Sequence, residues 1–153
     1  MKIYCKFTLI LIILILGSTF TQSAKKPNNC SLVKATEVGE VIGKKMTLGG
    51  DSILGCAYIP EGKKISYFTV LVTEKKDTPE SIFNNSRPSI KIEKLKGIGD
   101  AAAMAIEDGT ILDVVIFSGK WSVRFGVTFA DIETKTKKFE AFKALMKKAI
   151  TRL

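Results

Sequence analysis

The stretch "LKGIGDAAAM", Leu95–Met104, has the residue types of a phosphate-binding loop. Gly97 and Gly99 precede Asp100, and glycine-rich loops bind phosphate where a strand leads in and a helix follows. Here only "AAAMAIE" separates Asp100 from Asp108-Gly109, a pair that is typical of hairpin turns. The lysine of a P-loop is also missing. We therefore predict that this stretch is the entry to a β-strand and that it binds no phosphate.

Two acidic clusters, Glu107–Asp108 and Asp131–Glu133, offer the carboxylate pairs that a small hydrolase needs. Neither pattern gives a reason for a raised carboxyl pKa, which acid catalysis near neutral pH requires. The sequence contains no histidine, which excludes Ser-His and Cys-His catalytic pairs and histidine-based metal sites. We therefore predict that the protein is not an enzyme and has no catalytic, cofactor-binding or metal-binding residues. A carboxylate-dependent hydrolase is the alternative.

The first 24 residues have the pattern of a secretory signal peptide. Lys2 and Lys6 precede an apolar core, Phe7–Leu16, and small and polar residues follow to Ala24. The core is shorter than the roughly 20 residues of a membrane-spanning helix, although an uncleaved N-terminal anchor is the alternative. We expect an exported protein, periplasmic or secreted, with no membrane span after cleavage. Residues 25–153 would then form a single α+β domain, with a net charge two units below the +9 of the whole chain.

Cleavage removes Cys5 and leaves Cys30 and Cys56. Because export implies an oxidising compartment, we predict a disulfide between these two residues. On the chain-entropy model, closing this loop of about 27 residues would stabilise the fold by roughly 3.5 kcal/mol. The alternative is a pair of free thiols, one of them reactive.

The second half of the chain predicts consecutive β-hairpins, with turns at Asp108-Gly109 and Ser118-Gly119. In this register one apolar face carries Leu112, Val114, Ile116, Trp121, Val123 and Phe125, and the first hairpin adds Ala101, Ala103 and Ala105. The other face places Asp113 opposite Arg124, a favourable cross-strand pair. We expect this face, which also carries Ser122 and Thr128, to be mainly solvated, because antiparallel sheets commonly expose one face. The alternative is a binding surface.

The first half of the chain alternates short elements with turns. We predict a helix over Ala35–Ile42 that ends at Gly43, and a loop at "TLGGDSILG". Strands follow at "CAYI" and "KISYFTVLVT", joined by a turn at "PEGK". A brief helix begins after Thr78, and "SRPSIKIEKLK" is extended or irregular.

The C-terminal segment "TKKFEAFKALMKKAITRL" predicts a long amphipathic helix capped by Thr136. Its apolar stripe consists of Phe139, Phe142, Leu145, Met146, Ala149, Ile150 and Leu153. We expect this stripe to cover the alanine-bearing face of the sheet. The basic residues off the stripe are Lys137, Lys143, Lys147, Lys148 and Arg152. We expect them to be solvated; the alternative is a surface for an anionic partner, an anionic polymer or a membrane.

The segments "CSLVKATEVGEVIG", "CAY" and "GIGDAA" resemble a family of small exported bacterial proteins of unknown function, many of them lipid-anchored. The family is similar to the Mog1/PsbP-like α+β sandwich, and the resemblance covers Cys30–Leu153. It implies an antiparallel sheet with helices packed on it, a paired Cys30 and Cys56, and structural roles for "GIGD". It implies no catalytic residues. The sequence lacks the cleavage-site cysteine of the lipid-anchored members, and Lys34 stands where the family often has a capping Thr.

These patterns favour an exported, non-catalytic binding or accessory protein with an unknown ligand and an envelope or extracellular partner. Nucleic acid is not expected as a partner, because Trp121 belongs to the apolar face and offers no stacking platform for bases. The oligomeric state has no signal in the sequence.

Overall fold

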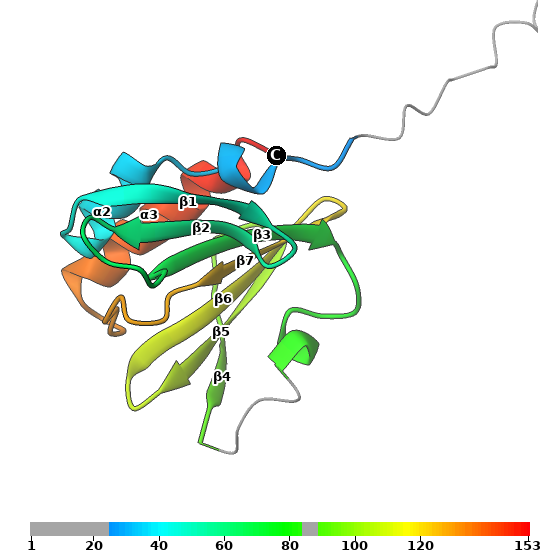
Figure 1. Cartoon of the computed structure of the whole chain (residues 1–153). Coiled ribbons are helices and arrows are strands. Elements are labelled where there is room, and N and C mark those ends of the chain that lie inside the picture. The colour runs from blue at the N-terminus through cyan, green and yellow to red at the C-terminus, as the bar shows by residue number, and fades with distance from the viewer. Residues whose placement is uncertain (1–24, 84–88) are drawn as a thin grey trace, which may run out of the picture.

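The computed structural model describes residues 25–83 and 89–153, so the predicted signal peptide, residues 1–24, lies outside the described residues. Within these ranges the chain forms a seven-stranded sheet in the order β1-β2-β3-β7-β6-β5-β4. Every neighbouring pair of strands is antiparallel. Figure 1 shows helices α2 and α3 packed on one face of this sheet. The predicted α+β fold is therefore confirmed.

The elements follow the chain with short connections. The strands are β1 Met46–Ser52, β2 Gly55–Pro60, β3 Phe68–Glu74, β4 Lys91–Lys94, β5 Ala101–Glu107, β6 Thr110–Ser118 and β7 Trp121–Gly126. The helices are α2 Ala35–Ile42 and α3 Lys137–Ile150, with short 3₁₀ turns η1 Asn29–Ser31 and η2 Glu80–Phe83. The first helix has its predicted bounds, and Gly43 ends it in the left-handed region at φ 75°.

Strand β1 contradicts the loop predicted for "TLGGDSILG". It pairs with β2 along the edge of the sheet, with a register shift between Leu48 and Gly50. Of its seven residues only Met46 is buried, so the segment has no apolar alternation to mark it as a strand. Its conformation is set by pairing with β2, which the local sequence does not reveal.

The main core lies between the sheet and the two α-helices. Phe142 of α3 is fully buried, and its ring packs edge-on against Phe68 of β3 and Phe125 of β7. Trp121 belongs to the same core with 8% of its surface exposed, as predicted. Thr136 caps α3 by accepting a hydrogen bond from the Phe139 N–H. The predicted apolar stripe of α3 therefore packs against the middle of the sheet.

The hairpin between β6 and β7 turns one residue later than predicted, at Gly119–Lys120. Val114 pairs with Phe125 and Ile116 with Val123, so the register is shifted by two residues. A shift of two residues keeps each side chain on its face, because the period of a strand is two. The predicted core positions of β7 therefore survive the shift.

The hairpin between β5 and β6 contains a β-bulge that reverses the predicted faces of β5 and of the first residues of β6, while Val114 and Ile116 keep theirs. Ala105 pairs with Asp113 while Ile106 pairs with Ile111, so Leu112 is an extra residue. Ile111 enters the main core in its place, and Ala103 lies on the opposite face of the sheet. The prediction that Leu112, Ala101, Ala103 and Ala105 face the C-terminal helix is therefore wrong.

The face of the sheet away from the helices, here called the outer face, is covered over one half only. Phe83 of η2 packs on Ala103, Ala105, Val115 and Phe117 in a second apolar cluster. The prediction of a mainly solvated face is wrong for this half, because the segment after β3 folds back over β5 and β6. The other half, over β3 and β7, carries the candidate site.

Candidate functional site

The stretch "LKGIGDAAAM" leads directly into β5, as predicted. Gly97 and Gly99 have positive φ angles of 76° and 62°. The Asp100 N–H donates to the Phe117 carbonyl at 2.7 Å, and the Asp100 carboxylate accepts from the Gly119 N–H at 2.8 Å. Because a strand follows the glycines, the loop does not lead into a helix as a phosphate-binding loop does. The aspartate instead joins the start of β5 to the turn between β6 and β7.

The two acidic clusters lie on neighbouring segments. An isolated bridge joins Thr110 to Glu133, and Glu107 accepts a hydrogen bond from the Ser89 hydroxyl at 2.7 Å. The side chains of Asp108, Asp131 and Glu133 are exposed. In the described parts of the chain, no three Cys, Asp or Glu side chains are grouped so that they could hold a metal ion.

The five basic residues of the C-terminal segment do not form one unoccupied surface. Arg152 and Lys148 both bind Glu37 of α2, and Lys143 pairs with Glu140 at 2.7 Å. Lys143 also lies over the Phe139 ring, 5.0 Å from its centroid. Lys137 and Lys147 are exposed. Three of the five cations are therefore paired with carboxylates of the protein itself.

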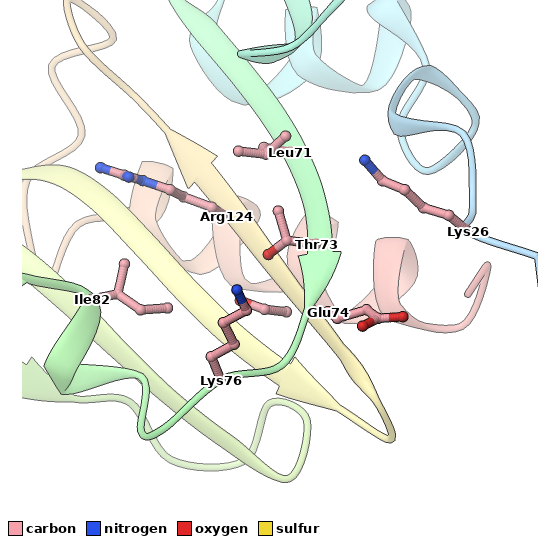
Figure 2. Close-up of a pocket in the computed structure, with 8 residues that line it drawn as sticks. Lys26, Leu71, Thr73, Glu74, Lys76, Ile82 and Arg124 are labelled. Atoms are coloured by element: carbon pink, nitrogen blue, oxygen red, sulfur yellow. The ribbon is translucent and has the colours of Figure 1, made fainter.

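The N-terminal arm is attached to the sheet by a disulfide and by one asparagine. The predicted bond between Cys30 and Cys56 is present. The buried Asn29 side chain donates to the Asp51 carboxylate and accepts from the Val72 N–H of β3, both at 2.7 Å. These contacts fix η1 against β2 and β3, and so they place Lys26, a few residues earlier, beside the outer face (Figure 2).

A hollow of about 580 Å³ lies on the outer face at this point. Its lining consists of Lys26, Leu71, Thr73, Glu74, Lys76, Ile82, Ser122 and Arg124. Figure 2 shows Lys26 on one side of β3 and Arg124 and Ile82 on the other, with Lys76 on the segment after the strand. Three cations thus surround a floor of hydroxyl and apolar side chains, with Glu74 as the one carboxylate of the lining.

A second hollow, of about 280 Å³, adjoins the first. Its lining consists of Leu54, Thr69, Leu71, Leu112, Asp113, Arg124, Gly126 and Thr128. Leu71 and Arg124 line both hollows, so we treat the two as one outer-face groove along β3 and β7. Thr69, Leu71 and Thr73 reach it because they alternate with the buried residues of β3.

Arg124 is held at the centre of the groove by Asp113. Its Nε donates to Asp113 Oδ2 at 2.6 Å, and its Nη2 contacts the same oxygen. The pair is diagonal across β6 and β7, where the sequence predicts a directly opposed pair. Asp113 is buried, and its Oδ1 has no hydrogen-bond partner within the described residues. Burial raises the pKa of the Asp113 carboxyl, while Arg124 beside it acts in the opposite direction.

The groove has the chemistry of an anion-binding site. Guanidinium and ammonium groups bind carboxylates and phosphates, and the threonine and serine hydroxyls add hydrogen bonds. The volume of the larger hollow lies within the range typical of small-molecule sites. Arg124 is anchored by Asp113 yet still exposed, so it is oriented before any ligand arrives.

Comparisons of the chain with family models, curated proteins and solved structures found no significant match. Function is therefore inferred from the contacts of the groove, and the family resemblance of the sequence stays a prediction. None of the helices in the described ranges has the length and apolar character needed to cross a membrane.

The sequence predicts four of the groove residues, Asp113, Ser122, Arg124 and Thr128, as members of the second sheet face. It does not predict Lys26, Lys76, Ile82 or Leu54, which come from the arm, the connections and a hairpin tip. The alternation in "FTVLVTE" contains the signal for Thr69, Leu71 and Thr73. No local pattern marks Lys26 as a groove residue, because its position depends on long-range contacts, the disulfide and the hydrogen bonds of Asn29.

Proposed function

We propose that the protein is an exported, non-catalytic binding protein that holds an anionic ligand in the outer-face groove. The convergence of Lys26, Lys76 and Arg124 on one groove carries this proposal. These cations come from the N-terminal arm, the segment after β3 and strand β7, so only the folded chain assembles them. The signal-peptide pattern of residues 1–24 and the disulfide support export.

The binding proposal is tested with residues 25–153 and a panel of small anions, phosphate and ethyl phosphate among them, by calorimetric titration. Lys76→Gln should weaken binding several-fold, because it removes one charge from the groove and its side chain is exposed. Lys64→Gln is the matched control, because Lys64 is also exposed and does not line the groove. Equal weakening by both changes would indicate a general effect of net charge and would contradict the proposal.

Arg124 provides a second test of the same groove. Arg124→Gln removes the charge and leaves Asp113 buried beside a neutral amide, so thermal unfolding must be measured with binding. Asp113→Asn keeps an amide oxygen that can accept the hydrogen bond from Arg124 Nε, and it removes the carboxylate charge that neutralises Arg124. We therefore expect tighter anion binding in Asp113→Asn than in the native protein, in a variant that still folds.

Export is tested separately by intact-mass spectrometry of the secreted protein. The mass should correspond to a chain that begins at Ala24 or Lys25. A mass that retains Met1 would show that residues 1–24 are not a cleaved signal.

A further inference from the structure

The outer-face groove combines its cations with apolar side chains whose exposure to water is unfavourable. Leu54 and Ile53, at the tip of the β1–β2 hairpin, are 75% and 94% exposed, and Ile82 of η2 is 38% exposed. Leu54 and Ile82 both line the groove. Exposed apolar residues that gather around one groove mark a contact surface.

The position of Leu54 is fixed by Gly55. This glycine is buried with φ 101°, and a Cβ added to it would lie 2.4 Å from the Val70 carbonyl oxygen. Only glycine lets the end of the hairpin lie this close to β3. The hairpin tip therefore stays against the sheet and keeps Leu54 on the same hollow as Leu71 and Leu112.

The two hollows differ in their chemistry. The larger one is lined by Lys26 and Lys76 together with Glu74, while the smaller one has no lysine and is lined by Leu54 and Leu112 beside the Asp113–Arg124 pair. Arg124 and Leu71 lie where they meet. A molecule that occupies both hollows would therefore place negative charge near the lysines and an apolar portion beside the leucines.

We infer that the ligand of the groove is a single anionic amphiphile, a molecule with one phosphate or carboxylate group and an alkyl chain of moderate length. The inference rests on the proposed anion-binding function of the groove. The head group lies among Lys26, Lys76 and Arg124. The alkyl chain of the ligand passes over Leu71 towards Leu54. Each methylene buried there should tighten binding roughly fourfold.

The test compares three soluble probes, all used below the concentration at which they form micelles. Octyl phosphate carries both features, ethyl phosphate has the same head group with a short chain, and octyltrimethylammonium has the chain with the opposite charge. By calorimetric titration of residues 25–153, octyl phosphate should bind at least tenfold more tightly than ethyl phosphate. Octyltrimethylammonium should not bind.

Leu54→Ser tests the contribution of the alkyl chain to binding separately from that of the head group. The variant should lose most of the advantage of octyl phosphate and keep the affinity of the native protein for ethyl phosphate. Ile65→Ser is the matched control, because Ile65 is 61% exposed and lies outside the groove, and it should change neither affinity. Thermal unfolding of both variants should match the native protein, since both side chains are exposed.

The possible outcomes are distinguishable. Equal affinity for octyl phosphate and ethyl phosphate would contradict the proposal of an amphiphilic ligand and would still agree with the proposed anion-binding function. Binding of neither phosphate would overturn both proposals. Binding of octyltrimethylammonium as tight as that of octyl phosphate would show that charge plays no part. Cosedimentation with phosphatidylglycerol vesicles, without binding of soluble octyl phosphate, would show that the surface binds membranes. It would contradict the proposal that the groove holds a single amphiphile molecule.

Discussion

Arg152 donates hydrogen bonds from both terminal nitrogens of its guanidinium group to the two carboxylate oxygens of Glu37, each at 2.7 Å. The two residues lie 115 positions apart in the chain. Glu37 is buried in the first turn of α2, and it also accepts from the Lys34 N–H at 2.9 Å and pairs with Lys148 at 2.6 Å. One carboxylate thus joins the N-terminus of α2 to the end of α3, and it caps the helix turn that Lys34 cannot cap with its own side chain.

Glu37→Gln should destabilise the protein by roughly 1.5–3 kcal/mol, because it replaces charge-assisted hydrogen bonds in a buried position with weaker neutral ones. The measurement is the free energy of unfolding in urea. Glu40→Gln is the control, because Glu40 is exposed on the same helix, and it should cost less than about 0.5 kcal/mol. A Glu37→Gln variant as stable as the native protein would mean that this bond contributes little.

Acid should weaken the same contact. The Arg152 guanidinium holds the pKa of the Glu37 carboxyl well below its ordinary value of 4.5. Because the folded pKa is lower than the unfolded one, the stabilisation is complete above the unfolded pKa and is lost as pH falls through the folded pKa. We expect the free energy of unfolding to decrease below about pH 4.5, and to decrease less in Glu37→Gln. The raised pKa of Asp113 makes its own contribution to stability change with pH in the opposite direction. Because this contribution is the same in the native protein and in Glu37→Gln, the difference between their pH dependences reports on Glu37.

Phe142→Ala should cost roughly 3–5 kcal/mol, as large aromatic deletions in cores do. The ring is fully buried against Phe68 and Phe125, so its removal leaves a cavity in the middle of the main core. Lys147→Glu on the same helix is the control, because Lys147 is exposed, and it should change stability by less than about 1 kcal/mol. Comparable losses in the two variants would show that the faces of α3 are assigned wrongly.

Replacing Cys30 and Cys56 together by serine should cost roughly 3.5 kcal/mol, the chain-entropy value for a loop of this length. The bond joins residues 26 positions apart and holds η1 against β2. Thermal unfolding with and without a reductant measures the effect. The native protein should lose stability on reduction, and the double variant should be indifferent to it. A native protein that is also indifferent would show that the bond is not formed in solution.

The glycines of "LKGIGDAAAM" give a matched pair of tests for a structural loop. Gly97 has a positive φ in open space, so Gly97→Ala should cost about 1–2 kcal/mol from the backbone alone. At Gly99 a Cβ would also lie 2.4 Å from the Phe117 carbonyl oxygen. Gly99→Ala should therefore be the more destabilising change when unfolding free energies are compared. Equal costs would contradict the close approach of this loop to β6.

The sequence alone determines most elements of this fold. Alternation along β3, β6 and β7 assigns the sheet, and the 3.6-residue stripe of α3 assigns its buried face, because these periods follow from backbone geometry. The pairing of Cys30 with Cys56 follows from the predicted export and from the fact that no other cysteine remains after it. Asp113 and Arg124 fall on one face by parity, so their contact survives a register shift of two residues.

The tertiary structure alone decides where those elements meet. The bulge at Leu112 reverses the faces of β5, because one extra residue in β6 exchanges the two sides of the partner strand relative to the rest of β6. No residue in "TILDVV" marks the insertion. The edge strand β1 forms only because its backbone pairs with β2. Lys26, Leu54 and Ile82 reach the groove through a disulfide, a hairpin tip and η2. Such contacts join residues that are distant in the chain, and local pattern carries no information about their distance in space.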